Sequence, residues 1–104
     1  MKIEHTHHVD AGEPDERGRY EYYYEYDLFV FSEAGVSVVA RSYSDMPGEA
    51  HFLRIEIGDA ALLLKPEDFR RPLVIAAVKH LRALGKHELS WLSGCGNGYE
   101  AVRT

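Results

Sequence analysis

The sequence predicts an α+β fold: an antiparallel four-stranded meander, one main helix packed on one face, and a C-terminal β-hairpin, in the order β-β-β-β-α-β-β. Three observations support this prediction: an aromatic segment that alternates with period two, shorter alternating segments separated by turn residues, and one amphipathic segment. A chain of 104 residues is long enough for one core, so we expect residues 20–104 to form a single domain. Residues 1–19 are expected to be a flexible segment, in which residues 2–9 can form a short strand.

The first strand of the meander is predicted at residues 20–31, which hold five of the seven tyrosines and two of the four phenylalanines. Aromatic and β-branched side chains favour a pleated, half-buried surface. Side chains alternate between the two faces of a strand, so the even residues from Tyr22 to Val30 form a continuously apolar or aromatic face, which we expect in the core. The odd residues, among them Phe29 and Phe31, are expected on the outer face. A β-bulge within residues 22–24 would exchange the two faces.

Three further strands are predicted at residues 36–43, 51–57 and 60–65. A brief helical turn is the alternative at residues 60–65, because alanine and leucine favour helices. A glycine-containing loop at residues 32–35 and a turn at residues 44–49 separate the longer strands, and Gly58-Asp59 fits a two-residue hairpin turn. The strands at residues 36–43 and 51–57 alternate, which indicates a sheet covered on one side. The side chains expected in the core from these strands are Val36, Val38, Ala40, Leu53, Ile55 and Ile57.

The main helix is predicted from Pro72 to Leu84, after a separate helical turn at residues 66–70. Two segments are expected because a proline inside a helix removes a hydrogen bond and costs about 3 kcal/mol. Gly85 supplies a C-terminal stop. The apolar side chains of the helix fall within one arc and are expected to pack on the sheet. They are Leu73, Val74, Ala77, Leu81 and Leu84.

The C-terminal hairpin is predicted from strands at residues 88–93 and 99–102, with Asn97-Gly98 in the turn. The glycines at 94, 96 and 98 are read as turn residues, because too few residues follow them to form a helix that holds a phosphate. No cofactor is therefore expected.

Composition limits the class of partner. The net charge of −5 argues against nucleic-acid binding through a general positive field. No segment approaches the roughly 20 apolar residues of a membrane span, so we expect no membrane partner. The single cysteine fits a reducing compartment, and the first residues do not resemble a signal peptide. We therefore expect a cytoplasmic protein.

The outer face of the meander is the predicted binding surface. Aromatic side chains would gather there among arginines and acidic residues, a composition that protein interfaces enrich. The alternative is that the helix, the N-terminal segment or the terminal hairpin covers this face, because large apolar patches are rarely bare on a monomer. The candidate binding residues are Tyr23, Phe29, Phe31, Val39, Arg41, Tyr43, Phe52 and Arg54.

Two other sites are candidates for metal binding and catalysis. His5, His7 and His8 form the candidate metal site, because imidazoles two residues apart on a strand project to the same side. A third or fourth ligand would have to come from elsewhere in the fold, and incidental surface histidines are the alternative. Cys95 lies among glycines and would need a base such as His87 to act as a nucleophile.

The function favoured by the sequence is therefore a small non-enzymatic binding module that acts on a protein partner or on a second copy of itself. The small, acidic layout with its aromatic sheet resembles bacterial immunity or inhibitor proteins in class and composition, which implies a protein partner. The alternative function is a small metal-binding protein or enzyme that uses the histidine-rich N-terminus or Cys95.

Overall fold

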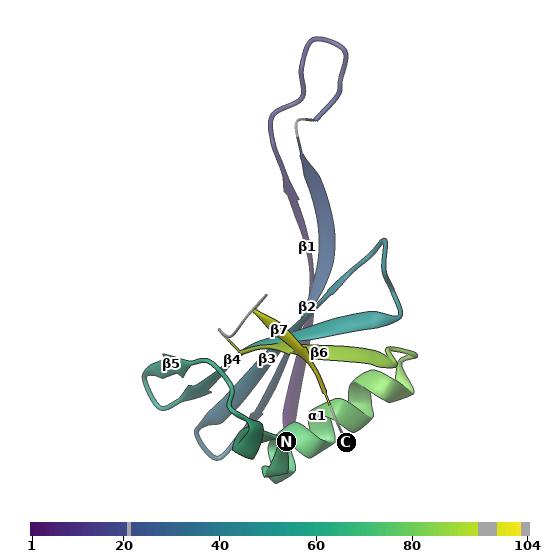
Figure 1. The fold of residues 1–104 in the computed structure, drawn as a ribbon. Helices are drawn as coiled ribbons and strands as arrows, with labels where there is room; N and C mark the ends of the chain where they lie inside the picture. The colour runs from purple at the N-terminus through teal and green to yellow at the C-terminus, as the bar shows by residue number, and fades with distance from the viewer. Residues whose placement is uncertain (21, 94–97, 103–104) are drawn as a thin grey trace.

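The computed structural model describes residues 1–20, 22–93 and 98–102, and these form a small α+β fold (Figure 1). The predicted fold class is confirmed at this level. The described strands are β1 (Lys2–Ala11), β2 (Tyr23–Glu33), β3 (Val36–Tyr43), β4 (Glu49–Ile57), β5 (Ala60–Leu62), β6 (Glu88–Leu92) and β7 (Tyr99–Ala101). The helical segments are the 3₁₀ turn η1 (Pro66–Arg70) and the helix α1 (Pro72–Ala83).

The sheet is mixed, and the prediction of an antiparallel sheet is wrong in this respect. Its seven described strands follow the order β1-β2-β3-β4-β6-β7, with β5 paired to β4 beside this path. All neighbouring pairs in the described chain are antiparallel except β4 and β6, which run parallel from Glu49↔Glu88 to Phe52↔Trp91. The reason is the crossover through η1 and α1, which returns the chain to the edge of β4 in the same direction. The predicted terminal hairpin is present as the antiparallel pair β6–β7.

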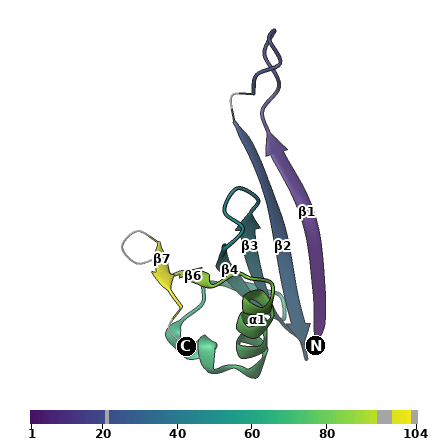
Figure 2. The ribbon, with the colours of Figure 1, turned by 90° about the vertical axis from the view of Figure 1, so that its right-hand side faces the viewer.

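The N-terminal segment forms a complete strand rather than a loose end. β1 pairs with β2 in one continuous antiparallel register, from Lys2↔Ser32 to Ala11↔Tyr23. Figures 1 and 2 show the distal part of this hairpin extending away from the rest of the sheet. We call residues 9–20 and 22–25 the arm; a bridge between Pro14 and Tyr20 closes its tip. The arm accounts for the elongated shape of the molecule, 50 × 28 × 26 Å.

The core lies between α1 and one face of the sheet (Figure 2). Phe29 and Phe31 are its central side chains, 1% and 0% exposed, and both rings contact the imidazole of His80 on α1. Their predicted place on the outer face is therefore wrong. The register explains the error, because Phe31 lies opposite Val38, and residues directly opposite in a sheet share a face.

A register shift between β3 and β4 corrects a second face assignment. Between Val39 and Ala40 the pairing skips Leu53, so that Arg54 lies opposite Val39 and Phe52 lies opposite Ala40. Phe52 and Ile55 are consequently both buried, although strict alternation would place them on opposite faces. The prediction that Phe52 is exposed on the outer face is wrong for this reason.

The helical segments match their predicted bounds to within one residue. Leu73, Val74, Ala77 and Leu81 are buried as expected, whereas Leu84 is 51% exposed. Leu84 follows the last residue of α1 as its C-cap, and Gly85 then turns the chain away with a φ of 89°. In the described part of the chain, no helix is long and apolar enough to cross a membrane.

Candidate functional site on the open face of the sheet

The face of the sheet opposite α1 carries the main group of functional side chains. Because Phe29, Val38 and Ala40 point to the helix, alternation directs their strand neighbours to the other side. We call this side the open face. Across β2 and β3 it is formed by Tyr24, Tyr26, Leu28, Val30, Val39, Arg41 and Tyr43. It continues over β4, β6 and β7 with His51, Ser90 and Tyr99.

Arg41 lies at the centre of the open face. Its guanidinium carbon is 4.8 Å from the ring centroid of Tyr43 and 5.9 Å from that of Tyr26, distances at which a cation interacts with aromatic rings. Nη2 donates a long hydrogen bond of 3.5 Å to the hydroxyl of Tyr99. Nε is buried and has no hydrogen-bond partner among the described residues. The planar group is thus fixed against tyrosine rings with donor capacity left over.

The arm extends this aromatic surface away from the core. Tyr20, Tyr22, Tyr23 and Tyr24 are between 45% and 53% exposed, although a tyrosine side chain is largely apolar. We call Arg41 with Tyr26, Tyr43 and Tyr99 the Arg41 cluster. The ring of Tyr24 contacts that of Tyr43, with 6.0 Å between centroids, which links the arm to this cluster. A shallow hollow of about 440 Å³ lies at this junction. Its walls are Tyr23, Tyr24, Glu25, Tyr43, Ser44 and Asp45.

A histidine–serine pair lies beside the cluster. Nδ1 of His51 and Oγ of Ser90 are joined by a short hydrogen bond of 2.5 Å, because the two residues are register partners on β4 and β6. Burial, and to a lesser degree the charge of Arg41, lowers the pKa of His51, so its imidazole is neutral near pH 7. In the tautomer that carries its proton on Nε2, this neutral imidazole accepts the hydrogen bond from Ser90 at Nδ1 and can take up the serine proton there.

The pair opens into a hollow of about 400 Å³ that has acidic residues in its lining. Glu49 and Glu88 lie opposite each other on β4 and β6, and a hydrogen bond with Glu88 raises the pKa of Glu49. Among the described residues, no carboxylate is hydrogen-bonded to the other ring nitrogen of His51, as the orienting acid of a catalytic triad would be.

The candidate metal residues are divided between two faces. His5 and His7 lie on the same side of β1, where Nδ1 of His7 is 2.7 Å and Nε2 of His5 is 3.3 Å from Oδ1 of Asp27. His8 lies on the open face, stacked on Tyr26. The described residues contain no group of three or more His, Cys, Asp or Glu side chains placed to hold a metal ion. The three histidines are therefore not brought together, and Asp27 already pairs with two of them.

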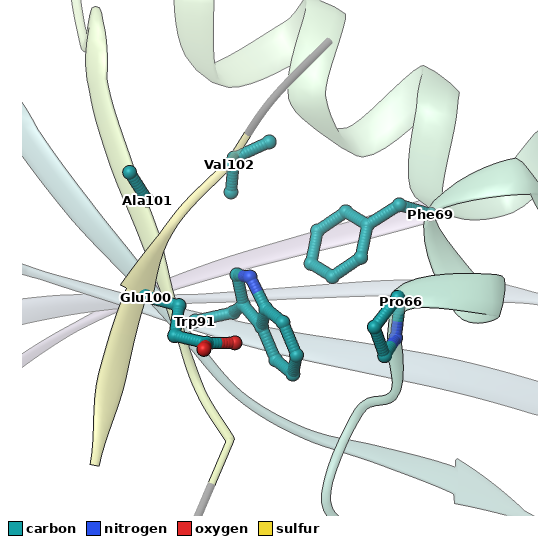
Figure 3. Close-up of a pocket in the computed structure, with 6 residues that line it drawn as sticks. All are labelled: Pro66, Phe69, Trp91, Glu100, Ala101 and Val102. Carbon is teal, nitrogen blue, oxygen red and sulfur yellow. The ribbon is translucent and has the colours of Figure 1, made fainter. Parts of the chain in front are cut away.

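A third hollow lies on the helix side of the sheet, between η1 and β7 (Figure 3). It measures about 510 Å³, and its lining includes the pair of Phe69 and Trp91, whose ring centroids are 5.3 Å apart. Figure 3 shows Pro66 and Phe69 on one side and Glu100 to Val102 on the other. Glu100 is the one charged group among the described residues of its lining, so this hollow lacks the several converging polar groups of a ligand site.

The eight predicted binding residues are distributed unevenly. Arg41 and Tyr43 lie on the open face, and Tyr23 lies on the arm. Phe29, Phe31 and Phe52 are in the core, and Val39 is 2% exposed, so none of the four can contact a partner in this conformation. Arg54 is exposed and paired with Glu56 on the same strand, at 2.9 Å. Cys95 lies outside the described residues.

Several residues of the site were not predicted: Tyr24, Tyr26, His51, Ser90 and Tyr99. The alternation of β2 contained the signal for the two tyrosines, since a tyrosine tolerates exposure better than a phenylalanine does. The other three meet only because β4 pairs with β6 and β6 pairs with β7, which no local pattern indicates. No protein-family model, curated protein or solved structure matches this chain.

Proposed function

We propose that the protein is a non-enzymatic binding module that recognises a protein partner through the Arg41 cluster of the open face and the tyrosines of the arm. The single observation that supports this proposal best is the state of Arg41, whose guanidinium lies against the rings of Tyr26 and Tyr43 on the open face. Tyrosine, tryptophan and arginine dominate the binding energy of protein interfaces.

The surroundings of Arg41 fit a protein rather than a small ligand. The aromatic surface is long and shallow, running from Tyr99 across Tyr43 to the exposed tyrosines of the arm. Such a surface offers rigid aromatic contact area with few rotatable bonds, as in antibody binding loops. Small-molecule sites instead enclose most of their ligand in a concave pocket.

Site-specific photo-crosslinking in extracts of the native cells tests this function. A photoreactive phenylalanine derivative in place of Tyr24 should capture one defined protein, because this side chain is 53% exposed next to Tyr43. The matched control carries the same group in place of Ile75, which is 40% exposed on α1. Capture of the same proteins at both positions, or of none at position 24, contradicts the proposal.

Competition then tests the role of Arg41. An excess of the unmodified protein should suppress the cross-link, whereas the Arg41→Lys variant should compete poorly. Lysine keeps the positive charge but lacks the planar group that stacks on Tyr43 and Tyr26. Equal competition by the Arg41→Lys variant would show that the guanidinium is not a contact.

A second candidate function, a serine nucleophile at Ser90, is favoured by the 2.5 Å hydrogen bond to His51 and the neutral state of that imidazole. An activated serine reacts with a fluorophosphonate probe, and an ordinary serine does not. Labelling of the intact protein that disappears in the Ser90→Ala variant would support this second function, and unlabelled protein would reject it.

A further inference from the structure

The outer edge of β1 is a part of the molecular surface separate from the open face. β1 is the first strand in the sheet order and pairs with β2 along one side, so its other side is an edge. Eight of its ten residues are exposed, including the apolar Ile3 and Val9 at 38% and 53%. An edge strand of this length presents backbone groups that can pair with another strand.

The hydrogen-bond pattern identifies which backbone groups face outward. The register of β1 with β2 ends at Ala11↔Tyr23, so the next residues, Gly12 and Tyr22, lie opposite each other. The amide of Gly12 donates to the carbonyl of Tyr22, which makes them a hydrogen-bonded pair. Hydrogen-bonded pairs alternate along an antiparallel ladder, and the register is continuous, so the even residues of β1 bond to β2. The odd residues therefore direct their amides and carbonyls away from β2. In the centre of the strand they are Ile3, His5, His7 and Val9.

On the open face, the side chains of β1 complement those of a second, reversed copy of the strand. The register that places Thr6 opposite its own copy also places Lys2 opposite Asp10. The same register places Glu4 opposite His8. The opposite charges of Lys2 and Asp10, and the pair of threonines, stabilise a sheet when they face each other across neighbouring strands.

The other face of β1 is complementary in the same register. Ile3 lies opposite Val9 there, which joins two exposed apolar side chains. His5 lies opposite His7, and each of these imidazoles already has Asp27 of its own chain beside it. An apolar cross-strand pair of this kind is favourable.

The neighbouring registers are less favourable. A shift of the pairing by two residues in one direction places Glu4 opposite Asp10, and like charges directly opposite each other destabilise a sheet. A shift in the other direction places Lys2 opposite His8 and leaves Asp10 beyond the end of the other strand. A shift of one residue would place the odd residues of one strand, whose amides and carbonyls point outward, opposite the even residues of the other, whose backbone groups already bond to β2. One register is therefore selected.

We infer that a second copy of this chain binds along β1, antiparallel and centred on Thr6, so that two sheets join into one continuous sheet. The four outward residues of each copy form four hydrogen-bonded pairs, and each pair exchanges two backbone hydrogen bonds. α1 does not obstruct this edge, because it packs on β2 and β3 (Figure 2). The antiparallel arrangement directs the two arms to opposite ends of the joined sheet.

Charge reversal on the full chain tests the register directly. Lys2→Glu alone places a glutamate opposite Asp10, and Asp10→Lys alone places a lysine opposite Lys2. Sedimentation velocity from about 10 μM to about 1 mM should show that either variant dissociates roughly tenfold more readily than the natural protein. An equimolar mixture of the two variants should recover the natural affinity, because each then faces an opposite charge. Asp59→Lys, which makes the same charge change as Asp10→Lys but in the exposed turn before β5, is the matched control.

Amide hydrogen exchange locates the contact. The amides of the even residues of β1 should be protected at all concentrations, while those of Ile3, His5, His7 and Val9 become protected only as the protein associates. A natural protein that stays monomeric at about 1 mM contradicts the inference. So does a mixture of the charge variants that fails to recover affinity, or association that leaves these four amides unprotected. Since the cross-link at position 24 reports on the open face and the arm, the two proposals can fail independently.

Discussion

Both halves of β2 carry aromatic side chains, but those of one half are buried and most of those of the other half are exposed. In the half from Leu28 to Glu33, Phe29 and Phe31 are 1% and 0% exposed beneath α1. In the half from Tyr23 to Asp27, Tyr23 and Tyr24 are 52% and 53% exposed on the arm. One strand, with one register to β1, thus serves both as the centre of the core and as part of an exposed surface.

The difference shows that a second layer, rather than aromatic content, decides what a strand buries. Phe29 and Phe31 meet the helix through His80, whereas the described ring contacts of Tyr24 are with other tyrosines, Tyr22 and Tyr43. Burial of an aromatic side chain stabilises the fold only when another element removes it from water. The tyrosines of the arm contribute little in that way, which agrees with a role in recognition.

The largest expected effect comes from substituting one aromatic residue in each half of β2. Phe31→Ala should lower the free energy of unfolding by about 3–5 kcal/mol, because it leaves a cavity beneath α1. Tyr24→Ala should change it by about 0.5 kcal/mol or less, because the side chain is half exposed. Urea denaturation followed by circular dichroism measures both. Similar losses for the two variants would mean that Tyr24 on the arm stabilises the fold as much as Phe31 in the core does.

A buried polar contact outside the arm, made by Lys86, gives the next largest effect. Lys86 is 8% exposed, and its Nζ donates to Oγ of Ser42 and to the carbonyl of Pro47, at 2.9 and 3.0 Å. Ser42→Ala removes one acceptor of this buried ammonium and should cost about 1–3 kcal/mol. Ser37→Ala is the control, since Ser37 is a half-buried serine on the same strand that bonds Ser32. Equal urea midpoints for the two variants would contradict the buried role of Lys86.

Local signals made the helical part of the fold predictable. Pro66 and Pro72 each fix the backbone at the start of a helical segment, and Gly85 can adopt the left-handed conformation that ends α1, so the observed bounds follow these residues. The pairing of β4 with β6 joins segments about 40 residues apart and follows from the path of the crossover, which no short pattern encodes. For β1, the sequence left open a short strand at residues 2–9 or a flexible segment, because few of its residues are apolar and its pairing with β2 is not encoded locally.

The prediction for β2 chose the wrong face because it counted tyrosine as a core residue. The even face contains more aromatic side chains, but their hydroxyl groups can remain in water. Phe29 and Phe31 have no polar side-chain atom, so two phenylalanines outweigh the tyrosines in deciding which face is buried. Arg41 and Tyr43 lie on the face opposite the helix as expected, since alternation within β3 holds. His51, Ser90 and Tyr99 depend on nonlocal pairing and had no such signal.

The smallest expected effect lies at the junction of the two halves, where Asp27 meets His7 and His5. The hydrogen bond to Asp27 raises the pKa of His7 above 6.5, although partial desolvation opposes it. For Asp27, partial burial would raise the pKa, but hydrogen bonds to His7 and His5 outweigh it and hold the pKa below 3.8. His7 therefore contributes stability below pH 6.5 that is lost as the pH rises through its folded pKa.

Asp27 contributes stability above pH 3.8 that is lost as the pH falls through its folded pKa. Both contributions are present together between pH 3.8 and pH 6.5, so the loss of stability in Asp27→Asn should be greatest near pH 5 and smaller at pH 3 and pH 9. Urea midpoints across this range measure the loss, and proton NMR of the His7 ring should show its pKa returning toward 6.5 in the variant. Because the two histidines are half exposed and Asp27 is partly exposed, solvent screens the interaction, and the effect should be well below that of Phe31→Ala. A loss that is independent of pH would mean that Asp27 stabilises this part of β2 through packing, and that its charge interaction with His7 and His5 contributes nothing measurable.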